Sequence, residues 1–249
     1  MGCRLLVPVE DLSLAPELAL TGTYDPAFIA FLSRSLQRGM TFVDVGANVG
    51  LFSIVAGTLV GPGGRVYAYE CNPDLLKLLN DNVAMNWLSE SVVIVDKAAS
   101  HSSGVAEFWA PPRFKGLGST LARSQHEAQS SDVQRLEVRT ERLDARLADA
   151  HFIDLIKVDV EGAEADVLDG ASALFESSRV GMLSIEFRQD TLTPASRVQM
   201  ETRLTDLHKR LRATFHVPNS ARPIPLDEVL MSCNYSQLLV RFPGSSIAP

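Results

Sequence analysis

The chain has 249 residues, 46% of them hydrophobic, which suffices for one globular domain with a substantial core. Its formal net charge of −7 disfavours nucleic acids and anionic membrane surfaces as main partners, because both attract basic proteins. The cysteines Cys3, Cys71 and Cys233 are far apart and form no Cys-x-x-Cys pair, which disfavours a thiolate zinc site.

Residues 1–40 are predicted to form a helical lead-in that caps one sheet edge or the mouth of the site. From residue 41 onwards, short apolar strands alternate with amphipathic helices, which predicts a mostly parallel α/β sheet with helices on both faces. A lid or insert is expected at about 105–139, with strands at 105–109 and 133–139 around a long loop. The strands predicted for the main sheet are 41–46, 65–70, 91–97, 152–159, 180–187, 213–217 and 237–242. The predicted helices are 51–60, 74–86, 163–173 and 194–213.

The first of these strands ends in the stretch DVGANVG. Glycines between a strand and a helix let a ligand approach the backbone, and the helix start offers free N–H groups. The spacing differs from the Gly-x-Gly-x-x-Gly of dinucleotide sites, and the Asp44 carboxylate would repel a pyrophosphate. A carboxylate suits a cation, so we expect S-adenosylmethionine, with Asp44 receiving its ammonium group directly or through water. Gly46, Asn48 and Gly50 would shape the turn beneath that ligand.

Acidic residues also follow the next two predicted strands. Glu70 ends the second strand, where a carboxylate can accept hydrogen bonds from both ribose hydroxyls. Asp96 lies at the end of the third strand and could accept from the adenine amino group, with the Lys97 backbone nearby. Cys71 is expected to be a small residue beside the ribose. Because parallel strands end in one crevice, we expect these groups to lie together.

A second motif, KVDVEGAEADVLDGA, begins inside the predicted strand 152–159. Asp159 leaves this strand where a reacting group would lie, and Gly162 permits a sharp turn into the next helix. Glu161 and Glu164 lie at the start of that helix, where carboxylates interact favourably with the helix dipole. For Glu164, such capping is the simpler explanation.

The stretches DVGANVG, YECNP and KVDVEGAEADVLDGA, in this order, resemble the FkbM-type methyltransferase family, a group of class I S-adenosylmethionine-dependent methyltransferases. The resemblance covers about residues 20–188. It implies a Rossmann-like fold with a mostly parallel seven-stranded sheet and an antiparallel last strand, in a domain spanning 41–249. It also implies O-methylation of a sugar or of a polyketide or macrolide-type natural product. The residues expected to contact the cofactor are Tyr24, Asp44, Gly46, Asn48, Gly50, Ser53, Glu70, Cys71, Asn72, Asp96, Lys97, Ala98 and Asp159.

The reaction requires removal of a proton from the acceptor hydroxyl. Asp159 or Glu186 could act as the general base, and Glu161 is a further catalytic candidate. Alternatively, Asp159 and Glu186 could hold a divalent metal that lowers the hydroxyl pKa, although the general base is favoured. Ser119 and Thr120, in a Gly/Ser stretch like that of the family, are candidate acceptor contacts. Arg188, where relatives often have a histidine, could hold an anionic or hydroxyl-rich acceptor.

Other functions remain open from the sequence. A nicotinamide-dependent oxidoreductase is disfavoured by the missing glycine triplet, and a methyltransferase-like binding module without activity is disfavoured by the intact motifs. Nitrogen as the acceptor atom is not excluded. The amino-terminal residues lack a signal-peptide pattern and no apolar run has membrane-spanning length, so we expect a cytoplasmic protein that acts on a small hydroxylated molecule, with neither nucleic acid nor membrane as partner.

Overall fold

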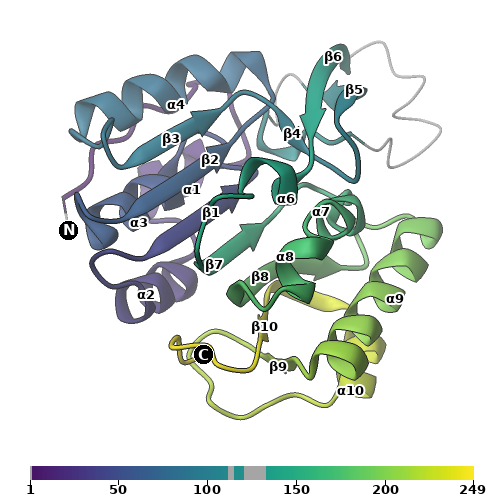
Figure 1. The fold of residues 1–249 in the computed structure, drawn as a ribbon. Helices are drawn as coiled ribbons and strands as arrows, with labels where there is room; N and C mark the ends of the chain where they lie inside the picture. The colour runs from purple at the N-terminus through teal and green to yellow at the C-terminus, as the bar shows by residue number, and fades with distance from the viewer. Residues whose placement is uncertain (1, 112–114, 121–132) are drawn as a thin grey trace.

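The computed structural model describes residues 2–111, 115–120 and 133–249. Its main sheet has the strand order β3-β2-β1-β7-β8-β10-β9 (Figure 1). β10 is antiparallel to β8 and β9, whereas the pairs β3-β2, β2-β1, β1-β7 and β7-β8 are parallel. The predicted fold class is therefore confirmed. The strands are β1 Thr41–Val45, β2 Arg65–Tyr69, β3 Val92–Val95, β7 Ile153–Val158, β8 Val180–Arg188, β9 Thr214–His216 and β10 Asn234–Arg241.

Helices cover both faces of the main sheet (Figure 1). On one face, α2 (Pro26–Ser35), α3 (Leu51–Val60) and α4 (Pro73–Met85) bury apolar residues in one core cluster. On the other face, a second and larger cluster contains residues of five helices. These helices are α6 Leu143–Arg146, α7 Glu164–Gly170, α8 Ser172–Glu176, α9 Pro194–Leu211 and α10 Leu226–Ser232.

The amino-terminal helices differ in their burial. α1 (Ala15–Thr21) has no buried residue, whereas α2 buries Phe28, Phe31 and Leu32 in the core beside the sheet. The division of the chain at residue 40 stays a prediction. No helix in the described part of the chain combines the length and the apolar composition that crossing a membrane requires.

The helix predicted at 163–173 is divided into α7 and α8. Gly170 ends α7, and a Cβ atom there would lie 2.1 Å from the Ser100 carbonyl oxygen, so a close approach of two backbones fixes this position. The short helices α6 and α10 were not predicted.

A small second sheet lies at the carboxyl end of the main sheet (Figure 1). Its strands β4 (Ala98–Ala99), β5 (Gly104–Ala110) and β6 (Gln134–Glu141) have the order β4-β6-β5. The 3₁₀ helix η1 (Lys115–Leu117) follows β5, and Ser119 then pairs with Trp109 of that strand. Most of the long loop predicted at 110–132 lies outside the described residues.

Candidate active site

A cavity opens where β1, β2 and β7 end. Its empty volume is about 1020 Å³ with the open mouth included. The predicted site residues that line it are Tyr24, Gly46, Asn48, Glu70, Cys71, Lys97, Ala98, Ser119, Thr120, Asp159 and Glu161. The described residues of the lining do not include Asp44, Gly50, Ser53, Asn72, Asp96, Glu186 or Arg188.

The turn after β1 approaches its neighbours closely because it has glycines. Gly46 has a φ of 81°, and a Cβ atom there would lie 1.9 Å from the Asp159 carbonyl oxygen. Gly50 has a φ of 93°, and its Cβ would lie 2.5 Å from Cδ1 of Leu79. Any other residue at Gly46 would separate the β1 turn from the end of β7. These two strand ends therefore form one continuous wall of the cavity.

Glu70 joins this turn to the segment after β2. It is only 8% exposed, and its Oε2 accepts a hydrogen bond from the Asn48 N–H at 2.9 Å. Its Oε1 accepts from the Asn72 N–H at 2.7 Å. Burial raises the pKa of Glu70. The Asn72 side chain caps α4 by accepting from the Asp74 N–H, which explains why it is not on the cavity wall.

Asp44 was expected to face a cationic ligand, but the structure places it behind the wall. It is fully buried and accepts a hydrogen bond of 2.6 Å from the Ser53 hydroxyl. Its cation is Lys157, whose Nζ lies 3.6 Å from Oδ1. Burial raises the pKa of Asp44. The predicted cofactor contacts of Asp44 and Ser53 stay predictions, and in this structure the two side chains pair with each other behind the cavity wall.

Lys157 connects Asp44 to the cavity. This lysine is 1% exposed and its Nζ also lies 3.2 Å from Oδ2 of Asp159. Burial alone would lower the pKa of Lys157, but Asp159 and Asp44 outweigh it and hold that pKa above its usual value. The sequence interpretation missed this residue. A lone lysine within the apolar strand DLIKVDV was the available signal, since lysines are almost never fully buried unless paired.

Three carboxylates meet beside the end of β7. Oxygens of Asp159, Glu161 and Glu186 all lie within 4.8 Å of one another. Glu161 has a φ of 58°, so the backbone takes the left-handed conformation at this turn. Glu186 is 8% exposed, and its burial, with the neighbouring acids second, raises its pKa to about 9. The adjacency predicted for Asp159 and Glu186 is present, with Glu161 as a third member.

Glu164 is fully buried behind these acids and accepts hydrogen bonds from the backbone of the turn. Its Oε1 accepts hydrogen bonds from the N–H groups of Val160 and Gly162, at 3.2 and 3.0 Å. Burial raises the pKa of Glu164 to about 7. These bonds hold the turn before α7, whose N-cap has no side-chain hydrogen bond, so Glu164 has a structural role that differs from the helix capping favoured by the sequence.

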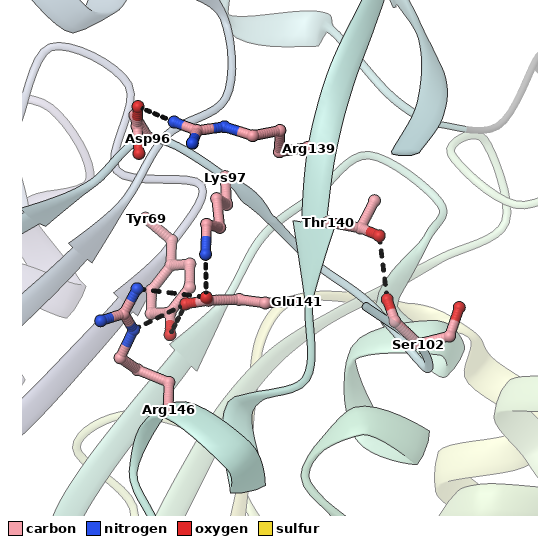
Figure 2. Close-up of polar contacts among 8 residues, drawn as sticks. All are labelled: Tyr69, Asp96, Lys97, Ser102, Arg139, Thr140, Glu141 and Arg146. Atoms are coloured by element: carbon pink, nitrogen blue, oxygen red, sulfur yellow. Dashed lines mark hydrogen bonds and ion pairs between the residues drawn. The ribbon is translucent and has the colours of Figure 1, made fainter. Parts of the chain in front are cut away.

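The segment after β3 differs from the prediction (Figure 2). The side chain of Asp96 points to Arg139 of β6, and Asp96 is not among the described residues that line the cavity. The expected contact of Asp96 with an adenine stays a prediction that its pairing with Arg139 does not support. Lys97 lines the cavity, and its Nζ pairs with Glu141 at 2.6 Å. Glu141 also accepts from the Tyr69 hydroxyl at 3.0 Å and pairs with Arg146, which fixes this part of the wall.

The candidate acceptor contacts divide into two groups. Ser119 and Thr120 line the cavity, and the Ser119 hydroxyl donates to the Val160 carbonyl at 3.3 Å. The guanidinium group of Arg188 donates two hydrogen bonds to the Asp190 carboxylate instead, and the Nε–Oδ1 distance is 2.9 Å. The prediction that Arg188 holds an acceptor at the cavity is therefore not supported by its position. The lining residues that the sequence did not indicate include Ser13, Leu14, Phe52, Tyr69, Phe108 and Leu117.

The strand order, the antiparallel β10 and a cavity at the carboxyl ends of the parallel strands define the Rossmann-like fold of class I methyltransferases. The solved structure of methyltransferase FkbM from Methylobacillus flagellatus KT has this fold, with a TM-score of 0.50 and 15% sequence identity. The alignment covers 91% of this chain and 52% of that one. The family model "Methyltransferase FkbM domain" matches residues 44–216, and the chain belongs to this family.

Curated relatives are similar over parts of the chain. Methyltransferase sdnD of Sordaria araneosa is 28% identical over an alignment of 161 residues, and the match covers 55% of this chain and 62% of that protein. The "Probable cobalt-precorrin-6B C(15)-methyltransferase (decarboxylating)" of Sulfolobus acidocaldarius is 40% identical over 55 residues, 22% of this chain and 29% of that protein. The chain thus spans less than two thirds of the length of these relatives.

Proposed function

We propose that this chain is an S-adenosylmethionine-dependent methyltransferase that methylates a hydroxyl group of a small molecule. The observation that carries this proposal is the family match over residues 44–216, which contains both wall-forming turns of the cavity. The fold and the family favour it over a nicotinamide-dependent oxidoreductase. The family resemblance points to a sugar or a polyketide or macrolide-type natural product as acceptor.

The residues of the cavity fit the proposed cofactor. Gly46 leaves the backbone bare at a place that a Cβ atom would fill, and Glu70 presents a carboxylate that can accept from ribose hydroxyls. Asn48, Cys71 and Ala98 complete the same wall. When bound, S-adenosylmethionine supplies a methyl group already activated on a sulfonium. The protein then has to hold the acceptor in line and exclude water.

Asp159 is the residue that we assign as proton acceptor. Its carboxylate lies on the cavity wall and contacts the Lys157 Nζ at 3.2 Å, which fixes its orientation. Ser119 and Thr120 face the same cavity from the segment after β5 and could donate to acceptor oxygens. Tyr24 closes the wall on the side of the amino-terminal helices, and burial, followed by Asp159, raises its pKa to about 12. Tyr24 therefore stays a neutral donor at physiological pH.

Calorimetric titration with S-adenosylhomocysteine tests the cofactor assignment. We expect micromolar binding by the wild-type chain and a loss of at least about tenfold, or about 1.4 kcal/mol, in Glu70→Gln. Glu90→Gln is the matched control, because Glu90 is exposed in the turn before β3, at the opposite end of the sheet. Circular dichroism verifies that each variant is folded. Titration with NAD⁺ in parallel tests the oxidoreductase alternative.

The acceptor requires a separate assay. Transfer of radiolabelled methyl groups to panels of glycosides and polyketide-type alcohols, with amines as comparison, identifies the acceptor atom. Folded wild-type protein that binds NAD⁺ and ignores S-adenosylhomocysteine would refute the proposed function. Binding of the cofactor with methylation of amines alone would refute only the hydroxyl acceptor.

A further inference from the structure

The carboxylates of Asp159, Glu161 and Glu186 form a compact group of oxygen donors. They come from the end of β7, the turn after it and the end of β8, and their oxygens lie within 4.8 Å of one another. Oxygens that bind one ion are about 4 to 5 Å apart at most, since Mg–O bonds are about 2.1 Å and Ca–O bonds about 2.3–2.6 Å. The observed limit of 4.8 Å fits the longer Ca–O bonds, and binding of Mg²⁺ or Mn²⁺ would draw the three oxygens closer together by a few tenths of an ångström.

Glu186 provides an independent indication of a ligand. It is 8% exposed, yet its Oε2 has no hydrogen-bond partner among the described residues. A buried carboxylate oxygen without a partner is costly, and a bound cation would satisfy it. The nearest guanidinium, that of Arg188, is 4.0 Å from the other oxygen, Oε1, and directs its fork to Asp190.

Among the described residues, acidic groups at this place outnumber the basic groups that contact them. Lys157 contacts Asp159, but this lysine also neutralises the buried Asp44. Glu164 adds a further acid directly behind the turn. Oxygen donors without histidine or cysteine favour hard cations over zinc.

We propose that Asp159, Glu161 and Glu186 bind one hard divalent cation, such as Mg²⁺ or Mn²⁺, at the wall of the cavity. Asp159 and Glu161 line this cavity, so the bound ion would be accessible to an acceptor oxygen. An ion in this place lowers the pKa of a coordinated hydroxyl, and Asp159 would then act as ligand instead of base. This catalytic role rests on the proposed methyl transfer, whereas the binding of the cation does not.

Titration with Mn²⁺ alone, followed by electron paramagnetic resonance on chelator-treated protein at constant pH, tests the site. We expect one bound Mn²⁺ per chain, displaced by Mg²⁺, and at least tenfold weaker binding in both Glu186→Gln and Glu161→Gln. Glu161 is included because it lies in a turn, so its substitution leaves the buried part of the sheet intact. Glu176→Gln is the control, since this exposed glutamate of α8 pairs with Arg210. All variants are compared by circular dichroism.

The outcomes separate this inference from the proposed function. Wild-type protein that binds S-adenosylhomocysteine but binds Mn²⁺ no more tightly than Glu161→Gln overturns the cation site alone. If Glu176→Gln weakened Mn²⁺ binding as much as Glu161→Gln does, the cation site would also be overturned, because the binding would then be unspecific. Saturable Mn²⁺ binding without any binding of S-adenosylhomocysteine would support the cation site and refute the methyltransferase proposal.

Discussion

Replacing Lys157 with methionine would remove the cation between Asp44 and Asp159 while keeping a side chain of similar volume. Asp44 would then be fully buried with only the Ser53 hydroxyl, 2.6 Å away, as partner for its charge. Removing one member of a buried ion pair costs roughly 3–5 kcal/mol. Asp159 contributes little to this loss, because it is partly exposed in the cavity and water can replace the lysine. We therefore expect the free energy of unfolding to fall by about 3 kcal/mol at pH 8.

This loss should depend on pH. The pKa of Asp44 is already raised by burial, and losing Lys157 raises it further. A carboxyl group with a raised folded-state pKa binds more protons when folded, so stability decreases as pH rises through that range. The loss in free energy of unfolding caused by Lys157→Met should consequently be smaller at pH 5 than at pH 8. The double variant Lys157→Met/Asp44→Asn, which has no buried charge at this place, should recover more than half of it.

Urea unfolding monitored by circular dichroism measures these differences, and a loss of about 3 kcal/mol corresponds to a midpoint lower by about 1 M. Lys77→Met is the matched control, because Lys77 pairs with Asp81 on the surface with 82% of its side chain exposed. That pair should contribute less than about 1 kcal/mol. A Lys157→Met variant that is as stable as Lys77→Met, or a double variant no better than the single one, would show that the buried pair does not stabilise the fold.

Three further substitutions test separate parts of the structure. Gly46→Ala places a Cβ atom 1.9 Å from the Asp159 carbonyl oxygen at a φ of 81°, so we expect a loss of roughly 2–4 kcal/mol in urea unfolding. Gly63→Ala, with nothing within 4 Å of its Cβ, should change stability by less than about 1 kcal/mol, and equal effects would contradict the close contact. The folded-state pKa of Glu164 is about 7 against a usual 4.5, so wild-type stability should fall as pH rises between these values, by about 3 kcal/mol. Glu164→Gln should reduce this decline. If the free energy of unfolding of this variant falls as steeply as that of the wild type across pH 4.5–7, Glu164 is not the group responsible. Glu141→Gln should lower the free energy of unfolding by about 1–2 kcal/mol, because its ion pairs of 2.6 and 2.8 Å would lose their charge; an unchanged thermal midpoint would contradict this.

Much of the main sheet was predictable from the sequence because glycines and prolines delimit its elements. α3 matches its predicted bounds, since Gly50 and Gly61 flank one continuous apolar run. The helices α6 and α10 have four and seven residues, too few for the period of 3.6 to be recognised.

The candidate-site residues whose surroundings the sequence did not predict are side chains with partners distant in sequence. Asp44 was predicted to lie near a cationic ligand because a carboxylate suits a cation, and in the structure Lys157 of the neighbouring strand β7 is that cation. Asp96 follows a strand as predicted, yet its side chain faces Arg139 of an inserted sheet. A sequence pattern shows which strand end carries a carboxylate, but the direction of the carboxylate depends on the charges that the fold brings to it.

The contact between Gly46 and the Asp159 carbonyl also affects how the two halves of the cavity respond to ligands. With no side chain between them, the turn that would carry the cofactor and the turn that would carry the acceptor cannot shift independently. We therefore expect linked equilibria, in which occupancy of one subsite changes the affinity of the other by the same factor in both directions. Steady-state kinetics would then show an ordered or cooperative pattern of substrate binding, in place of two independent dissociation constants.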